Sequence, residues 1–281
     1  MNRIDELFLR KQKSVLSVYF TAGYPELTDT GLIISGLEKA GADLIEIGFP
    51  FSDPVADGPV IQASSHQALL NGMNLDILFD QLRELKETSR IPKIMMGYFN
   101  TVYQFKVDRF INQCVECGID GVIIPDLPPE VYEKDYRELF ESAGIHFICL
   151  VAPQTSSDRA KYLASLSRGF IYLLSSSSTT GGKYSPVRED LRVLPSRFSR
   201  EADGFLPTLI GFGIHDHETF EMACRHANGA IIGTGFIRWL TANLKRQEKG
   251  HVTKDVRQQQ INNRQQQINI LCENFVDQIR G

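Results

Sequence analysis

Two carboxylates, Glu46 and Asp57, are the residues of this chain best placed for acid–base chemistry. Glu46 interrupts an apolar run at positions 43–48, where strand alternation puts Ile45 and Ile47 on the opposite face. A carboxylate inside a protein resists ionisation, so a buried Glu46 would have the raised pKa that a general acid needs near neutral pH. The alternative is a structural glutamate that is held by an arginine or a lysine.

Asp57 stands on a stiff loop that directly follows this run. Residues 50–59 contain three prolines and one glycine, which keep the segment out of a helix and restrict its shape. A rigid loop is a good platform for a fixed carboxylate. Asp53 and Asp57 could instead cap the turn or the following helix, which is a common role for aspartate.

Glycines gather in three later segments that each follow an apolar run, at Ser175–Gly182, Gly211–Gly213 and Gly233–Gly235. A glycine lets backbone N–H groups approach an anion closely, and a helix N-terminus adds favourable polarity. Each segment alone is more often just a turn, but three together predict a phosphate site. The first continues to Tyr184, and its length and flexibility are typical of a lid.

Tyr172 lies in the apolar run 170–174. It either faces the same interior as Glu46, where it could donate a hydrogen bond to Glu46 or to a substrate, or packs as an ordinary core residue.

Residues that could bind a metal are few. His215 and His217 are spaced as a pair, but surface polar residues are the favoured interpretation. Cys114 and Cys117 have the spacing of half a zinc site, and no second pair follows, so buried reduced thiols are favoured. The sequence predicts no metal site, and it shows no Ser–His–Asp framework, phosphate-binding P-loop or dinucleotide fingerprint.

The elements that position these residues are short apolar runs alternating with helix-length stretches. The eight predicted strands are Val15–Thr21, Asp43–Gly48, Lys93–Gly97, Gly121–Ile124, His146–Val151, Phe170–Leu174, Thr208–Phe212 and Ala230–Ile232. Helix-length stretches between them include Thr28–Ala40, Leu75–Ser89, Glu130–Ala143 and Asp158–Ser167. Such alternation indicates a parallel sheet, and eight units favour an α/β fold of the (β/α)8 (TIM) barrel class, with an extra N-terminal helix. Active sites of such barrels lie at the C-terminal ends of the strands.

The chain is expected to form one domain over residues 1–281. Gly41, Gly118 and Gly144 each end a helical stretch before a strand, as a repeated unit requires. Gln247–Gln267 is polar, rich in glutamine and poor in residues that could anchor a core, so it is either a solvated helical extension or a mobile insertion. Asn269–Ile279 regains apolar spacing and is expected to be the last helix.

Composition limits the class of protein. Of 281 residues 42% are hydrophobic and 23% are charged, which provides a core and excludes general disorder. The net charge of −4 gives no overall attraction to nucleic acid or to anionic membranes. No run is long and apolar enough for a membrane helix, the N-terminus does not read as a signal peptide, and five scattered cysteines suit a reducing compartment. We therefore expect a cytoplasmic protein that binds neither nucleic acid nor membranes.

A long motif around the two carboxylates resembles the α subunit of tryptophan synthase. Residues 45–59 read IEIGFPFSDPVADGP, which is similar to the signature of that family. Further matches follow in the same order, at Gly23–Pro25, Tyr172–Ser175, Thr180–Gly181 and Gly211–Ile214. The resemblance covers most of the chain from Met1 to Leu240.

The resemblance implies a (β/α)8 barrel that cleaves indole-3-glycerol phosphate to indole and glyceraldehyde 3-phosphate, in the last stage of L-tryptophan biosynthesis. It implies a β-subunit partner that carries pyridoxal phosphate, an α2β2 heterotetramer, and no cofactor in this chain. Matched residue by residue, Glu46, Asp57 and Tyr172 take the catalytic positions. The positions matched to substrate binding are Tyr19, Met96, Tyr98, Ile123 and Pro125 around the indole ring, and Thr180, Gly181, Gly211, Phe212, Gly213, Gly233 and Thr234 around the phosphate.

Three positions depart from the family pattern. Ser176 stands where the lid usually carries an arginine, Thr234 stands in place of a serine, and Pro125 stands where a small residue is usual. Three alternatives stay open: a non-catalytic partner that only regulates a β subunit, a stand-alone lyase that releases indole, and a barrel enzyme for another sugar phosphate. Intact Glu46 and Asp57 argue against the first of these.

Overall fold

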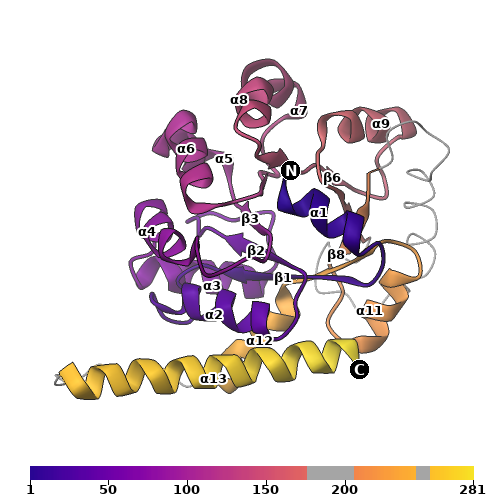
Figure 1. The fold of residues 1–281 in the computed structure, drawn as a ribbon. Coiled ribbons are helices and arrows are strands. Elements are labelled where there is room, and N and C mark those ends of the chain that lie inside the picture. Colours follow the sequence, from indigo (N-terminus) through magenta and orange to yellow (C-terminus); the bar gives the residue numbers. More distant parts are fainter. Residues whose placement is uncertain (176–205, 245–253) are drawn as a thin grey trace.

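The computed structural model describes residues 1–175, 206–244 and 254–281, and within them the strands form one parallel sheet (Figure 1). The strand order is β5-β4-β3-β2-β1-β9-β8-β7-β6, and every pairing is parallel. The strands are β1 (Val15–Thr21), β2 (Leu44–Gly48), β3 (Lys93–Met96), β4 (Gly121–Ile123), β5 (His146–Phe147), β6 (Leu150–Val151), β7 (Ile171–Leu174), β8 (Thr208–Gly211) and β9 (Gly229–Ile232). The predicted barrel class is confirmed.

The fifth predicted strand, 146–151, is interrupted. Its two halves, β5 and β6, pair with β4 and β7 respectively and are separated by Ile148 and Cys149. The backbone N–H of Cys149 leaves the sheet and donates to Ser167 Oγ at 3.0 Å, which breaks the regular strand pairing. Ile148 N still donates to Val122 O at 3.1 Å, and Cys149 O accepts from Tyr172 N at 3.1 Å. With β5 and β6 counted as one interrupted strand, the barrel has eight strands, and it closes through Ile148 and Cys149.

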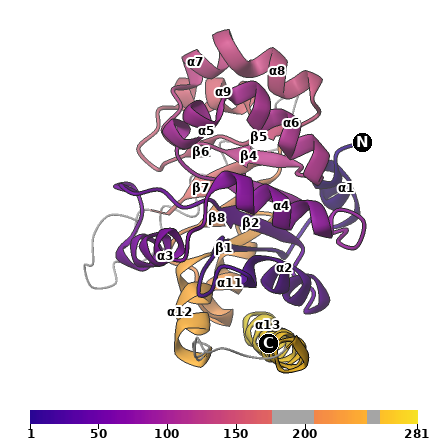
Figure 2. The ribbon, with the colours of Figure 1, turned by 90° about the vertical axis from the view of Figure 1, so that its left-hand side faces the viewer.

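Helices surround this ring (Figures 1 and 2). They are α1 (Arg3–Arg10), α2 (Asp29–Lys39), α3 (Pro59–Leu70), α4 (Leu75–Leu85), α5 (Phe99–Phe105), α6 (Val107–Cys117), α7 (Pro129–Val131), the π-helical turn η1 (Tyr132–Tyr136), α8 (Arg137–Ser142), α9 (Ser157–Leu166), α11 (His217–Cys224), α12 (Thr234–Asn243) and α13 (Lys254–Arg280). The four predicted helical stretches correspond to α2, α4, the α7–η1–α8 run and α9. The predicted glycine turns at Gly41, Gly118 and Gly144 all have positive φ. None of the helices in these described ranges is long and apolar enough to cross a bilayer.

Side-chain alternation along the strands divides the core into two layers. Outward residues such as Ile45 and Ile47 pack against the helices, and inward residues such as Leu44 and Ile94 fill the barrel. The inner layer receives further side chains from α1, whose Ile4, Leu7 and Phe8 are buried there. The barrel is thus a packed core rather than a pore.

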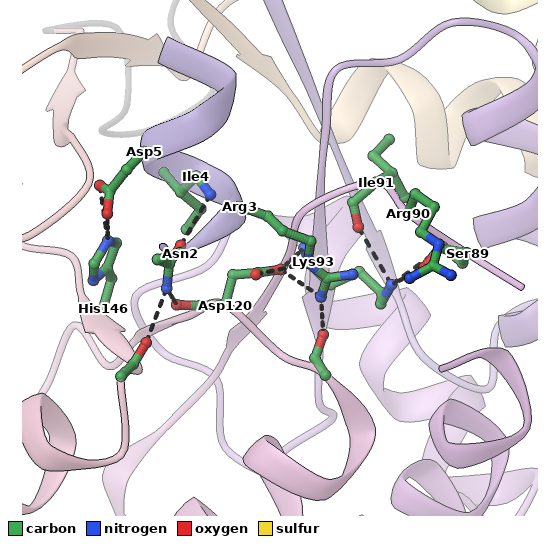
Figure 3. A network of polar contacts seen from close by, with 12 residues as sticks. Asn2, Arg3, Ile4, Asp5, Ser89, Arg90, Ile91, Lys93, Asp120 and His146 are labelled. Atoms are coloured by element: carbon green, nitrogen blue, oxygen red, sulfur yellow. Dashed lines mark hydrogen bonds and ion pairs between the residues drawn. The ribbon is translucent and has the colours of Figure 1, made fainter. Parts of the chain in front are cut away.

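Helix α1 is fixed to the N-terminal ends of the strands by polar contacts (Figure 3). Arg3 Nε donates to Asp120 Oδ1 at 2.8 Å, and Asp120 Oδ2 accepts from the backbone N–H of Lys93 at 2.9 Å. His146 Nε2 lies 2.9 Å from both carboxylate oxygens of Asp5. The predicted extra N-terminal helix therefore covers the end of the barrel opposite the candidate site.

The last helix, α13, lies along α2 and also contacts α11 and α12 (Figures 1 and 2). It begins at Lys254, so most of the glutamine-rich stretch 247–267 is helical, and the part before Lys254 lies outside the described residues. Arg264, inside that stretch, is 4% exposed and donates from Nε to Asp29 Oδ1 at 3.0 Å. The sequence analysis expected few residues of this stretch to pack into the core, and it missed this buried ion pair.

Candidate active site

Glu46 lies on β2 with no exposed surface, among the inward-facing side chains. Its Oε1 accepts a hydrogen bond of 2.9 Å from Ser17 Oγ on the neighbouring strand β1. Burial raises the pKa of Glu46 to about 8, and the hydrogen bond from Ser17 acts in the opposite direction. Glu46 is therefore mostly a neutral acid at pH 7, which is the form that can donate a proton.

Asp57 lies on the loop between β2 and α3 and is half-buried. Its Oδ2 accepts a hydrogen bond of 3.3 Å from the hydroxyl of Tyr98, which itself accepts from the backbone N–H of Ala56 at 3.0 Å. Burial raises the pKa of Asp57 to about 6, and the hydrogen bond from Tyr98 lowers it. At pH 7 Asp57 is thus mainly ionised. Asp53, the other acid of the loop, is exposed and accepts from Ser52 Oγ.

Two buried tyrosines respond to the charges of these carboxylates. Tyr19 on β1 is the register neighbour of Glu46; burial raises its pKa, and the charges of Asp57 and Glu46 raise it further. Burial and the charge of Glu46 likewise raise the pKa of Tyr172 on β7. Each tyrosine therefore lies within electrostatic reach of both carboxylates.

Glycines at the strand ends make room for the aromatic rings. A Cβ on Gly48 would lie 2.2 Å from the Tyr19 hydroxyl oxygen, and a Cβ on Gly211 would lie 2.2 Å from that of Tyr172. Each ring therefore occupies the space that a side chain on the neighbouring strand would fill. Gly211, matched above to the phosphate region, provides the space that the Tyr172 ring occupies.

An apolar pocket opens beside these rings and holds about 460 Å³ of empty space, its open mouth included. Its lining residues are Tyr19, Asp57, Ile61, Met96, Tyr172, Phe212, Gly213, Ile214, Ile231, Gly233 and Thr234. A second hollow adjoins it through Tyr19, Asp57 and Met96, and Tyr98 and Pro125 also line it. Such apolar walls are typical of a site for a flat apolar ring, and one carboxylate, Asp57, lies within the lining.

One part of the pocket lining has features that favour an anion. Thr234 is the first residue of α12, Gly233 precedes it, and no side chain caps the first N–H groups of this helix. Phe212 has a positive φ of 68°, a conformation that few non-glycine residues adopt, and its carbonyl accepts from Ser175 Oγ at 2.8 Å. The strained turn and the helix N-terminus border one pocket, which is a favourable place for a phosphate.

Some of the matched positions fall elsewhere. Ile123 is fully buried in the barrel interior and lines neither hollow. Thr180, Gly181 and Ser176, with the rest of the expected lid, lie outside the described residues.

The structure also brings in residues that the sequence interpretation missed. Ser17 is the hydrogen-bond partner of Glu46, and Ile61, Ile214 and Ile231 line the pocket. A serine inside the apolar run 15–21 was the available signal for Ser17, but only the strand register places it beside Glu46.

The potential metal ligands do not converge. Among residues 1–175, 206–244 and 254–281, no three His, Cys, Asp or Glu side chains are grouped as a metal site would require. Cys114 and Cys117 are buried free thiols, and Cys117 Sγ lies 3.3 Å from the carbonyl oxygen of Phe79. His217 Nδ1 contacts the carbonyl of Ile279 at 2.9 Å, which joins α11 to the end of α13.

Comparison with known proteins gives consistent results. The family model described as tryptophan synthase alpha chain matches residues 7–266. The tryptophan synthase alpha chain of Flavobacterium psychrophilum is 50% identical over 243 residues, which cover 86% of this chain and 95% of that protein. That of Bacteroides thetaiotaomicron is 48% identical over 242 residues, which cover 85% and 93%.

Solved structures share the fold. Tryptophan synthase subunit alpha from Legionella pneumophila superposes with a TM-score of 0.78 at 30% identity, covering 99% of this chain and 98% of that one. A chain of tryptophan synthase from Mycobacterium tuberculosis gives a TM-score of 0.79 at 23% identity over the full length of both chains, a likeness that shows the fold alone. Because the family model spans most of its length and curated relatives are about half identical to it, this chain belongs to the tryptophan synthase alpha chain family.

Proposed function

We propose that Glu46 and Asp57 carry out the lyase reaction of the tryptophan synthase alpha chain family in this protein. The reaction is the retro-aldol cleavage of indole-3-glycerol phosphate to indole and glyceraldehyde 3-phosphate. One observation supports these roles above all. Glu46, buried beside the pocket-lining residues Tyr19 and Tyr172, has a pKa near 8, and Asp57 in the pocket lining has a pKa near 6, so that one is a neutral acid while the other is an anion.

The first step is proton transfer to the ring. An indole carbanion is a poor leaving group, so C3 of the indole must be protonated before the C3–side-chain bond breaks. Glu46, which is neutral at pH 7, donates this proton and becomes a carboxylate. The protonated ring is cationic at nitrogen, and the ionised Asp57 in the pocket lining stabilises it by accepting the N–H hydrogen bond.

The second step breaks the carbon–carbon bond. The carboxylate of Glu46 accepts the proton of the side-chain hydroxyl as the carbonyl of glyceraldehyde 3-phosphate forms. The electron pair of the broken bond returns to the ring and restores neutral indole. One proton has left Glu46 and one has returned, so the enzyme ends in its starting state.

The phosphate group fixes the position of the substrate in the pocket. It is expected at the N-terminus of α12, where Gly233, Thr234 and Gly213 border the pocket. Binding energy from this remote group positions the ring without taking part in bond breaking. Tyr172, Phe212 and Met96 then supply the apolar walls around the ring.

A β subunit is the proposed partner. Family membership implies it, and we propose that it carries pyridoxal phosphate, receives the indole, and forms an α2β2 heterotetramer with this chain. This chain itself needs no cofactor for the cleavage, because general acid–base groups suffice. The free thiols and the charge balance support a cytoplasmic location.

The test compares two variants with one matched control, in the isolated chain and with a β subunit. Glu46→Gln and Asp57→Asn remove the two proposed charges with little change of shape. Each is expected to lower kcat for indole release by about 10²–10⁴-fold with little change in substrate binding. Asp53→Asn changes the exposed acid on the same loop and is expected to keep near-normal turnover in the isolated chain.

Near-normal turnover in Glu46→Gln would contradict the assignment. If the unaltered chain released no indole even with a β subunit but still stimulated that subunit, the regulatory alternative would replace it.

A further inference from the structure

Ser17 is a fully buried serine whose hydroxyl contacts the proposed acid. It lies on β1 two residues before Tyr19, and strand alternation therefore directs both side chains into the barrel. Its Oγ lies 2.9 Å from Glu46 Oε1. Within the described part of the chain this is the one hydrogen bond that either side chain makes.

The second oxygen of Glu46 has a different environment. Oε2 is buried and has no hydrogen-bond partner among the described residues. Tyr19 from β1 and Tyr172 from β7 are the titratable groups whose pKa the charge of Glu46 raises, and the charge of Asp57 acts on the same two tyrosines. No arginine, lysine or histidine within the described ranges forms an ion pair with Glu46. The hydrogen bond from Ser17 to Oε1 is therefore what makes the two oxygens of Glu46 different.

The protonation chemistry of a carboxylic acid makes this asymmetry meaningful. A neutral carboxyl group has one hydroxyl oxygen, which donates, and one carbonyl oxygen, which accepts. If Ser17 donates its single proton to Oε1, then Oε1 is the carbonyl oxygen and Oε2 must carry the acid proton. The first arrangement leaves one buried group, the Oε2 hydroxyl, without a partner, whereas the reverse arrangement would leave two, the Ser17 proton and the carbonyl oxygen Oε2, and is therefore more costly.

We propose that Ser17 is a positioning residue that keeps the acid proton of Glu46 on Oε2, the oxygen that makes no hydrogen bond among the described residues and so has its proton available for transfer. This inference rests on the proposed function, because the position of the proton matters only if Glu46 is the acid. Ser17 touches neither substrate nor reacting atoms, and it acts through Glu46.

Removing the hydroxyl has two expected effects. In Ser17→Ala the proton can reside on either oxygen, so about half of the enzyme is ready to react and kcat falls by about twofold. The Glu46 carboxylate also loses its hydrogen bond, so its pKa rises and the alkaline limb of the kcat profile moves up by about one pH unit. KM is expected to stay the same, because Ser17 does not line the pocket.

The experiment uses the full chain and a matched buried serine. Ser17→Ala, Ser17→Thr and Ser89→Ala are assayed for indole release from pH 6 to pH 10. Ser17→Thr keeps the hydroxyl and is expected to restore most of the activity and the original alkaline limb. If the extra methyl group of threonine disturbs the core, Ser17→Cys replaces that variant in the test. Its thiol has a similar size and is a weaker donor, so an intermediate result is expected. Ser89 is equally inaccessible but contacts Lys93 Nζ, at 3.1 Å, at the other end of the barrel (Figure 3), so its variant is expected to behave as the unaltered chain.

A second readout does not depend on turnover. Difference infrared spectroscopy, with Glu46→Gln as the blank, follows the carboxylic acid band of Glu46 as the pH rises. In Ser17→Ala this band is expected to change frequency and to titrate at higher pH.

The outcomes separate the two proposals. If Glu46→Gln is inactive while Ser17→Ala keeps its kcat, alkaline limb and infrared band, the role of Ser17 is refuted and the proposed function stands. If Glu46→Gln is active, the proposed function fails before Ser17 is considered. A loss of kcat in Ser17→Ala without any shift of the alkaline limb or of the infrared band would indicate a purely structural serine and would also overturn the inference.

Discussion

At the residue scale, two carboxyl groups of the same chemical kind behave differently because their surroundings differ. Glu46 has no exposed surface and one hydroxyl partner, whereas Asp57 is half-buried on a loop. Burial raises the pKa of both groups, and it raises that of Glu46 further. The neutral acid and the anion that the reaction needs can therefore coexist near neutral pH.

The pH dependence of turnover follows from these two values. Asp57 loses its charge as the pH falls through about 6, and Glu46 loses its proton as the pH rises through about 8. We expect kcat for indole release to be bell-shaped, with its maximum between these values. The measurement is steady-state turnover from pH 5 to pH 10.

The substrate phosphate also titrates near the acidic limb, so the control repeats the assay with the dephosphorylated substrate. An acidic limb that disappears with the phosphate group would exclude Asp57 as its cause. Activity that keeps rising above pH 9 would contradict a neutral Glu46 as the acid.

How much of the site the sequence could predict also depends on the residue. Glu46 and Asp57 stand out by type, because an acid within an apolar run and an acid on a proline-rich loop are unusual. Ser17 does not stand out, since a single serine in a strand has no special chemistry of its own. Its role depends on the pairing of β1 with β2, in which Ser17 lies opposite Leu44, and this register is not written in either strand alone.

At the element scale, the strand ends are built from pairs of a glycine and an aromatic ring. Replacing Gly211 with alanine would put a Cβ 2.2 Å from the Tyr172 hydroxyl oxygen, so the ring must move. We expect Gly211→Ala to lower the free energy of unfolding by about 1–3 kcal/mol and to lower kcat/KM for the cleavage. Chemical denaturation and steady-state kinetics measure the two effects.

Gly31 supplies the control for this substitution. It lies on α2, where a new Cβ would meet Leu85 at an ordinary 3.6 Å. Alanine favours a helix over glycine, so Gly31→Ala is expected to be neutral or stabilising with normal kinetics. Equal effects of the two substitutions would mean that the contact with Tyr172 is unimportant.

The elements themselves were predicted better than their interruptions. The eight strands follow from apolar runs and glycine turns, and their ends differ from the predicted ends by only a few residues. The break at Ile148 and Cys149 could not be predicted, because it depends on a hydrogen bond to Ser167, which follows α9 and lies 18 residues after Cys149 in the sequence. The helix in the glutamine-rich part of α13 could not be predicted from an apolar pattern, because the residue that fixes it to the core is the charged Arg264.

At the scale of the whole molecule, α13 is held to the barrel by a buried ion pair between distant parts of the chain. Arg264 and Asp29 are almost fully inaccessible, so removal of one partner leaves an uncompensated buried charge. We expect Arg264→Met to lower the free energy of unfolding by about 3–5 kcal/mol, as measured by urea denaturation.

An exposed ion pair gives the comparison. Arg83 contacts Asp80 at 2.8 Å on the surface of α4, and Arg83→Met is expected to change stability by less than about 1 kcal/mol. Similar losses in both variants would show that burial adds nothing to the pair at Arg264.

The ion pair also constrains when the protein can fold during synthesis. Arg264 and Asp29 are 235 positions apart, and β1 pairs with β9 near the end of the chain. While the ribosome is still adding the last segments, Asp29 has no cationic partner and β1 has an open edge. Because domains emerge from the ribosome N-terminus first, the nascent chain must keep both sites from wrong associations until its final helix has left the exit tunnel.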